Sequence, residues 1–188
     1  MTPWEFLNRR ASVPAKLLGE PGPDDATLAR LLTLAVRVPD HGRLTPWRFI
    51  RVAGEARHAL GEGLARLTLG RKSDTDPALV EKDRRRFSHA PLVIVVVAQL
   101  TPGHKVPEQE QLLSAGCVGF NLLLGAQALG YGAQWLTGWP AYDPEVAALL
   151  GLAANERVVG FIHIGTPREP APERARPDPM SLLSDFQP

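Results

Sequence analysis

The sequence predicts a protein in which helices pack on a β-sheet, and three stretches carry that prediction. The run 112–130 contains no charged residue and places apolar side chains on every face, as a helix does when it is buried all round. The run 91–98 is apolar and β-branched on both faces, which predicts a strand in the middle of a sheet. Residues 157–164 predict a second buried strand, which ends at Gly165-Thr166-Pro167.

The N-terminal part of the chain predicts two helices. Residues 3–10 form a short amphipathic helix closed by Arg9 and Arg10, a pair that alone fits a solvated helix end completing the helix dipole. Asp24 or Asp25 caps the next helix. Its apolar residues recur at helical spacing and stop before Pro39; they are Leu28, Leu31, Leu32, Ala35 and Val36.

A polar loop, residues 37–47, follows this helix and precedes a predicted strand at 47–52. It combines Arg37, His41 and Trp47 and is pinned by two prolines, a composition typical of ligand-contact loops. His41 fits a surface histidine equally well, so the loop alone leaves both interpretations open.

Two surface helices are predicted at 56–69 and 77–86, joined by the polar turn 72–76. The run Arg84-Arg85-Arg86 fits a solvated helix end better than a nucleic-acid contact, because its neighbourhood is balanced in charge. Further on, His104, Glu108 and Glu110 are possible metal ligands. An acidic first turn of the long helix explains the two glutamates as well.

The long helix is the centre of the predicted fold. Its small residues, Ser114, Ala115, Gly116 and Gly119, predict close approach of another helix or a ligand. Gly130 and Gly132 are expected to stop it, and 133–136 to lead into a short strand. Such a helix in a chain of 188 residues indicates that a second subunit supplies part of its cover. Its glycines, polar residues and flanks without basic bias argue against a membrane span.

The C-terminal third predicts one more helix and an arm. Asp143-Pro144 has the cap and first-turn proline of a helix start, and Gly151 ends that helix. Six prolines in the last 22 residues predict an extended Pro-rich arm over about 166–188, able to wrap a neighbour or lie over the surface. No linker divides the chain, so we expect a single domain, 1–188.

Composition excludes several classes of function. A net charge of +1 and a pI of about 8.0 favour neither nucleic acid nor an anionic membrane. The single cysteine, Cys117, cannot form an internal disulfide, and no secretory signal is evident, so we expect a reduced, cytoplasmic setting. Phosphate-loop, dinucleotide, nucleophile-elbow and paired-cysteine motifs are absent from the sequence. An enzyme built on this chain would therefore take its chemistry from a cofactor.

Short motifs along the chain occur in an order that is typical of one protein family. They are Arg9-Arg10, Arg37-x-Pro39-Asp40-His41, Pro46-Trp47, His104-Lys105-Val106-Pro107, Ser114-Ala115-Gly116, Gly130-Tyr131-Gly132, Trp135-Leu136-Thr137-Gly138 and Gly165-Thr166-Pro167. Each is weak singly, but the ordered set is specific. By these motifs the chain resembles the nitroreductase family of flavoproteins, in particular its short YdjA-type branch.

This resemblance implies an α+β fold, with a mixed, largely antiparallel sheet flanked by helices and a buried central helix at the core of an obligate homodimer. It implies two FMN sites built from both chains, NAD(P)H as the electron donor, and a nitroaromatic, quinone or similar electron-poor small molecule as the acceptor. The chemistry would take place on the flavin, with no catalytic side chain and no metal. The alternative is a flavin-binding protein of the same fold with another reaction, a dehydrogenase or flavin-remodelling one, or without useful turnover.

The resemblance also assigns roles to individual positions. FMN would be contacted by Arg9, Arg10 and Ala11 of one chain, by Arg37 and His41 of the other, and by Trp135, Leu136 and Thr137. The nicotinamide donor would lie at Gly125, Ala126, Gln127, Ala128, Leu129 and Gly130. The chain departs from the family where Ala11 replaces a serine, Val13 an arginine, and Leu136 an often basic residue. Arg43 and Arg176 are the candidates to supply a missing contact.

Overall fold

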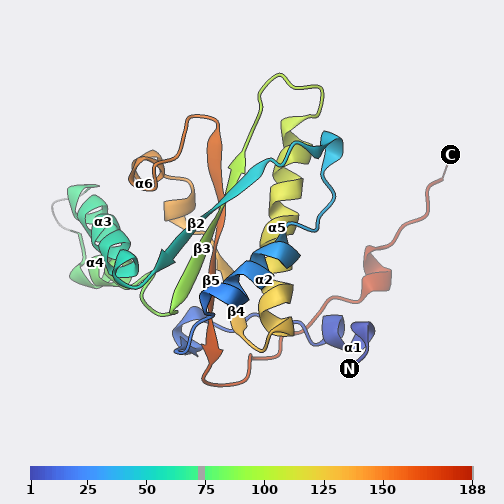
Figure 1. Cartoon of the computed structure of the whole chain (residues 1–188), viewed down its shortest axis with the longest axis horizontal. Helices are drawn as coiled ribbons and strands as arrows, with labels where there is room; N and C mark the ends of the chain where they lie inside the picture. Colours follow the sequence, from blue (N-terminus) through green and yellow to red (C-terminus); the bar gives the residue numbers. More distant parts are fainter. Residues whose placement is uncertain (72–74, 188) are drawn as a thin grey trace.

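The computed structural model describes residues 1–71 and 75–187, and in this part of the chain one antiparallel sheet forms the centre (Figure 1). Its strands are β1 (Leu18–Gly19), β2 (Trp47–Ala53), β3 (Leu92–Gln99), β4 (Gly132–Leu136) and β5 (Glu156–Pro167). The order is β1-β5-β3-β2, with β4 also paired to β5, and every pairing is antiparallel. β3 lies between β2 and β5, which confirms its predicted central place.

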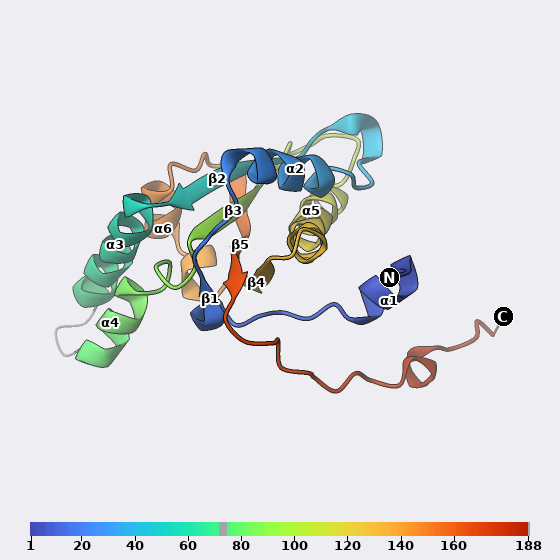
Figure 2. The same cartoon turned by 60° about the horizontal axis from the view of Figure 1, so that its bottom comes forward.

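Helices cover both faces of this sheet (Figure 2). On one face α2 (Asp25–Ala35) and α5 (Glu108–Ala128) pack against Ile94, Val96 and Ala98 of β3. On the other, α3 (Glu55–Arg71) and α6 (Pro144–Leu149) pack against the alternate residues of the same strand, and α4 (Pro77–Arg84) lies on α3. Because side chains alternate along a strand, this doubly covered strand reads as an unbroken apolar run.

The predicted helix boundaries rest on local chemistry that the structure confirms. Asp24 is the N-cap of α2 and accepts a hydrogen bond from the backbone of Thr27, while Asp143 caps α6 in the same manner. Gly130 and Gly151 follow the last residues of α5 and α6 with φ of 84° and 67°. Both lie in the left-handed region in which glycine terminates helices at little cost.

α5 begins at Glu108, so Glu108 and Glu110 lie in its acidic first turn as expected, and within one chain the helix is buried on one face only. Its inner residues Ala115 and Val118 are fully buried, whereas Leu113 is 61% exposed and Phe120 44% exposed on the opposite face. The expected burial of every face therefore requires a second subunit. No helix among the described residues is long and apolar enough to cross a membrane.

The small residues of α5 serve contacts other than those predicted. A Cβ on Gly119 would lie 2.9 Å from the indole of Trp135, so this glycine admits a ring from β4 rather than another helix or a ligand. Ser114 bonds the loop before β2, and Gly116 faces open space. The interpretation of the whole set as one close-approach surface is wrong for Gly119 and Ser114.

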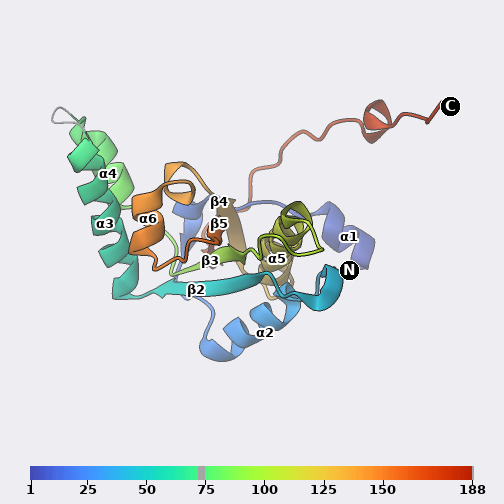
Figure 3. The ribbon, with the colours of Figure 1, turned by 90° about the horizontal axis from the view of Figure 1, so that it is seen from above.

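The chain ends are the parts least attached to the sheet. α1 (Pro3–Asn8) is a short helix whose N-terminus is capped by a Thr2–Glu5 capping box. The C-terminal residues leave β5 as an extended arm that runs out past α1 (Figure 3), interrupted by one short 3₁₀ turn at Pro179–Leu182. The arm carries exposed apolar side chains, among them Leu182 and Phe186.

Candidate functional site

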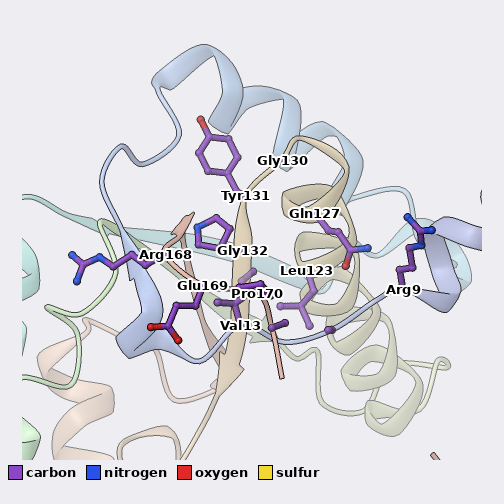
Figure 4. A pocket seen from close by; sticks show the side chains of 14 residues that line it. Arg9, Val13, Leu123, Gln127, Gly130, Tyr131, Gly132, Arg168, Glu169 and Pro170 are labelled. Carbon is purple, nitrogen blue, oxygen red and sulfur yellow. The ribbon is translucent and has the colours of Figure 1, made fainter. Parts of the chain in front are cut away.

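A cavity of about 520 Å³ lies where α1, α5, β4 and the start of the arm meet (Figure 4). It brings together four residues with predicted roles: Arg9, Ala11, Gln127 and Gly130. In Figure 4, Arg9 and Gln127 lie on one side of the cavity, and Arg168 and Glu169 lie on the other. Two predicted FMN contacts and two predicted NAD(P) contacts therefore share one cavity.

α1 and the arginine pair are held at the C-terminal end of α5. The side-chain amide of Gln127 donates to the backbone carbonyl of Phe6 at 3.3 Å, which anchors α1. The guanidinium of Arg176 donates to the carbonyl of Arg10 at 3.4 Å. Of the two arginines considered as substitutes for a missing contact, Arg176 thus lies beside the pair. Arg43 lies in the 3₁₀ turn His41–Arg43, beside the opposite end of α5.

The segment after α1 runs along the outer edge of β4. The backbone N–H of Val13 donates to the carbonyl of Ala133 at 3.1 Å, and that of Ala15 donates to the side chain of Gln134 at 2.6 Å. Because hydrogen-bonded and non-hydrogen-bonded pairs alternate in an antiparallel ladder, the N–H and C=O of Trp135 point to the same outer edge as those of Ala133. Within the described chain β4 pairs with no strand on that edge, so the edge remains open at Trp135.

The indole of Trp135 is turned away from this edge and packs between the sheet and α5. A Cβ on Gly160 would fall well inside van der Waals contact with the indole, and one on Gly119 would lie 2.9 Å from it. Trp135 therefore presents its backbone, not its ring, at the edge of β4. Leu136 and Thr137, the other two predicted contacts in this segment, are half-buried beside it.

The turn that follows the predicted flavin segment is fixed by a buried carboxylate. Asp83 of α4 is 5% exposed and accepts hydrogen bonds from Thr68, Arg86 and the indole N–H of Trp139. The ring of Trp139 also lies under the guanidinium of Arg71, 4.2 Å from its centroid. Trp139 comes two residues after Thr137, so this network holds the end of the segment. No sequence motif marks Asp83, which looks like any helical surface aspartate.

The loop carrying Arg37 and His41 is tied to α5. Nδ1 of His41 lies 2.7 Å from a carboxylate oxygen of Glu110, and the hydroxyl of Ser114 donates to the carbonyl of Pro39 at 2.9 Å. The amide of Asn121 donates to the carbonyl of Arg37 at 3.1 Å. Sequence reasoning missed these ties, although polar residues spaced by four and seven on an otherwise apolar helix could have indicated them.

The predicted FMN contacts do not all meet within one chain. His41 lies at Glu110 and Arg9 lies in the cavity with Gln127. Seventeen residues of helix separate Glu110 from Gln127, or roughly 25 Å at 1.5 Å per residue. Arg37 lies between these ends, in a smaller cavity of about 280 Å³ that also contains Gly125 and Ala128.

Two predicted NAD(P) contacts lie at the core, and the possible metal ligands have other partners. Ala126 is fully buried and Leu129 packs against the core, and neither lines the cavity that contains Arg9. Nδ1 of His104 accepts from the N–H of Val106, and Glu108 pairs with Arg157. The described residues contain no group of three His, Cys, Asp or Glu side chains that could hold a metal.

The arginine run at the end of α4 forms ion pairs on a partly exposed surface. Arg84 contacts Glu62 and Glu81, and Arg85 also contacts Glu81. Arg86 contacts the buried carboxylate of Asp83. The side chains of Arg84 and Arg85 remain 39% and 66% exposed, which agrees with a solvated helix end, whereas that of Arg86 is 20% exposed and is held by Asp83.

Comparison with known proteins identifies the family. The Nitroreductase family profile matches residues 7–166, so the chain belongs to the nitroreductase family. A curated relative, "Putative NAD(P)H nitroreductase YdjA" of Escherichia coli (strain K12), is 35% identical over 182 residues, covering 96% of this chain and 97% of the relative. Family membership confirms the resemblance seen in the motifs and the prediction of a nitroreductase-like oxidoreductase.

Solved structures confirm the fold. A nitroreductase-like family protein from Bacillus cereus superimposes with a TM-score of 0.84 at 23% identity, over 100% of this chain and 97% of that one. A nitroreductase with bound FMN from Bacteroides fragilis superimposes with a TM-score of 0.72 at 19% identity, over 100% of both chains. The predicted α+β nitroreductase-like class, a sheet flanked by helices, is thus confirmed.

Proposed function

We propose that this protein is an FMN-dependent oxidoreductase that passes two electrons from NAD(P)H to a nitroaromatic, quinone or similar electron-poor acceptor. The observation that carries the proposal is the open edge of β4 at Trp135, beside a cavity of about 520 Å³ that contains Arg9 and Ala11. The names of the relative from Escherichia coli and of the FMN-bound structure from Bacteroides fragilis support this cofactor and this donor.

The residues present fit the chemistry of FMN. A phosphate carries about two negative charges and is well matched by arginine. Three arginines lie together here: Arg9 lines the cavity, Arg10 follows Arg9 in the chain, and Arg176 bonds the carbonyl of Arg10. The open backbone N–H and C=O of Trp135 match the donors and acceptors on the edge of an isoalloxazine ring. Bound FMN would accept a hydride from the nicotinamide and pass two electrons to the acceptor.

The protein's own part in this reaction is binding and orientation. The arginines hold the charged end of the cofactor, and the backbone at Trp135 fixes the plane of its ring. The network of Asp83 and Trp139 keeps the segment 135–137 in place.

We further propose that the active form is a homodimer whose sites are shared. Leu113 and Phe120 form an exposed apolar stripe on α5, whose burial would stabilise an interface. The separation of roughly 25 Å along α5 is too long for one FMN to reach both His41 and Arg9 of one chain. In a shared site, Arg9 and Arg10 would meet Arg37 of the partner subunit and His41 of the partner subunit at one flavin.

Cofactor analysis tests the first proposal. The purified protein should show the absorbance of oxidised FMN, and NADH or NADPH should bleach it under anaerobic conditions. Arg10→Ala should weaken FMN binding by roughly 10- to 100-fold, because a charge-assisted hydrogen bond contributes about 1.5–3 kcal/mol. Arg66→Ala, at an exposed arginine of α3, is the matched control and should bind FMN as the parent does. Released FAD, or no flavin after soaking with FMN, would refute the proposal.

Mixed dimers test the shared site. Arg10→Ala and His41→Ala are prepared separately, unfolded, mixed in equal amounts and refolded. Half of the dimers are then mixed, and each mixed dimer holds one site with both lesions and one site with neither, so roughly a quarter of all sites are intact. Activity should rise toward that fraction, whereas each mutant refolded alone stays low. If the two residues serve one site from one chain, no activity returns.

A further inference from the structure

One edge of α5 is polar, and each of its polar side chains contacts the loop between α2 and β2. Glu110, Ser114 and Asn121 are separated by four and seven residues, so they lie on one side of the helix. They contact His41, Pro39 and Arg37 respectively. The loop is therefore held against α5 at three points between Arg37 and His41. We call these three residues the loop tether.

Asn121 determines where the loop begins. Its amide nitrogen lies 3.3, 3.4 and 3.1 Å from the carbonyl oxygens of Leu34, Ala35 and Arg37, so its two N–H groups are shared among the three carbonyls. Those carbonyls lie at the C-terminal end of α2, where no glycine follows to close the helix and where a backbone N–H, that of Arg37, reaches only the carbonyl of Leu34. The side chain of α5 thus replaces a helix cap, and the backbone leaves α2 in a fixed direction at Arg37.

Ser114 and Glu110 fix the rest of the loop. The hydroxyl of Ser114 holds the carbonyl of Pro39, two residues before His41. A carboxylate can only accept hydrogen bonds, so the proton between Glu110 and His41 belongs to Nδ1 of the imidazole. That contact sets the orientation of the ring and directs Nε2 away from α5.

We infer that Glu110, Ser114 and Asn121 are positioning residues that act on the flavin of the partner subunit, not on the flavin of their own chain. The inference rests on the proposed function, in which Arg37 and His41 reach across the interface. One helix then serves both sites of the dimer. Leu123 and Gln127 line one cavity, and Glu110, Ser114 and Asn121 hold the loop that reaches the other.

The main test uses the double variant Glu110→Ala/Ser114→Ala. Both side chains lie on a partly exposed helix surface, so their truncation leaves the core intact. The double variant should weaken FMN binding about tenfold. Glu110→Gln should bind nearly as the parent, because its carbonyl oxygen still accepts from Nδ1 of His41. Glu108→Ala is the control, since Glu108 belongs to the same helix turn but pairs with Arg157.

Mixed dimers then decide on which flavin the tether acts. FMN is held at a concentration that fills parent sites but leaves those of the double variant mostly empty. Refolding the double variant with Arg10→Ala should restore activity toward a quarter of all sites, because the two lesions fall in the same site of a mixed dimer. Refolding it with His41→Ala should restore none, since those lesions then occupy different sites.

Each other outcome overturns the inference. Recovery with His41→Ala but not with Arg10→Ala would show that the tether acts on the flavin of its own chain. Parent-like FMN binding by the double variant would show that the loop does not need the tether. If Arg10→Ala and His41→Ala fail to complement each other, the shared site itself is refuted, and the inference fails with it. This failure is distinguishable from the two outcomes above, because in both of them Arg10→Ala and His41→Ala still restore activity when they are refolded together. Glu110→Ala alone serves as a milder variant where the double variant refolds poorly.

Discussion

Replacing His163 should reduce the loss of stability between pH 7 and pH 5 by about 2 kcal/mol. This histidine of β5 is fully buried, and neither of its ring nitrogens has a hydrogen-bond partner among the described residues. Its ring lies parallel to that of Phe87, with 6.0 Å between centroids. Burial, with lesser contributions from His89 and Arg86, lowers its pKa from 6.5 to about 4.

The sign follows from where the proton binds. In the unfolded chain the imidazole protonates near its ordinary pKa, while in the folded chain it stays neutral down to about pH 4. The unfolded state therefore binds more protons between these values, and the stability of the fold decreases as the pH falls through this window. The whole difference corresponds to about 3 kcal/mol, of which about 2 kcal/mol is lost between pH 7 and pH 5.

Urea unfolding of the parent and of His163→Leu, at equal protein concentration and at several pH values, measures this contribution. The parent should lose about 2 kcal/mol more than the variant between pH 7 and pH 5. His58→Leu, at an exposed histidine of α3, should behave as the parent does. The series stops at pH 5 because Arg48 holds the pKa of Glu156 at about 2. The Arg48–Glu156 pair therefore weakens only at pH values below this range. Equal losses in the parent and in His163→Leu would refute the reasoning.

Three further changes test the packing around the site. Asp83→Ala should cost about 1–3 kcal/mol in urea unfolding, because it leaves the half-buried guanidinium of Arg86 and the indole N–H of Trp139 without their acceptor; an unchanged free energy of unfolding would contradict this. Gly160→Ala should cost about 1–3 kcal/mol, since the added methyl group overlaps the indole of Trp135, and an unchanged Tm would contradict it. Asn121→Ala should cost about 1 kcal/mol and loosen the end of α2, as measured by faster amide exchange there; parent-like exchange would count against the cap.

Local chemistry made much of the fold predictable. The unbroken apolar run of β3, the caps at Asp24 and Asp143, and the glycines that close α5 and α6 each depend on a few neighbouring residues. β1 was not predicted, because Leu18–Gly19 is only two residues long and exists through its pairing with Thr166 and Pro167, far away in the sequence. Strands of that length carry no pattern of their own.

The candidate site was predictable in part. The motifs identified the family, and the structure groups Arg9 and Ala11 with Gln127 and Gly130. The supporting residues were missed, since Asp83 and Asn121 act through contacts with helices that are distant in sequence. The partition of the contacts between two ends of α5 was likewise invisible, because it depends on how the α2–β2 loop lies along that helix.

The packing of Trp135 gives the protein an optical signal of its own. Its indole is clamped between Gly119 and Gly160, while its backbone lies at the open edge of β4. A ring held this way keeps one orientation, so its fluorescence emission responds to what arrives beside it rather than to its own motion. A bound flavin absorbs where tryptophan emits, and energy transfer from this fixed donor would quench it. Trp139 is kept because its indole N–H bonds Asp83, so the decrease in total tryptophan emission would follow cofactor binding in real time without any added label.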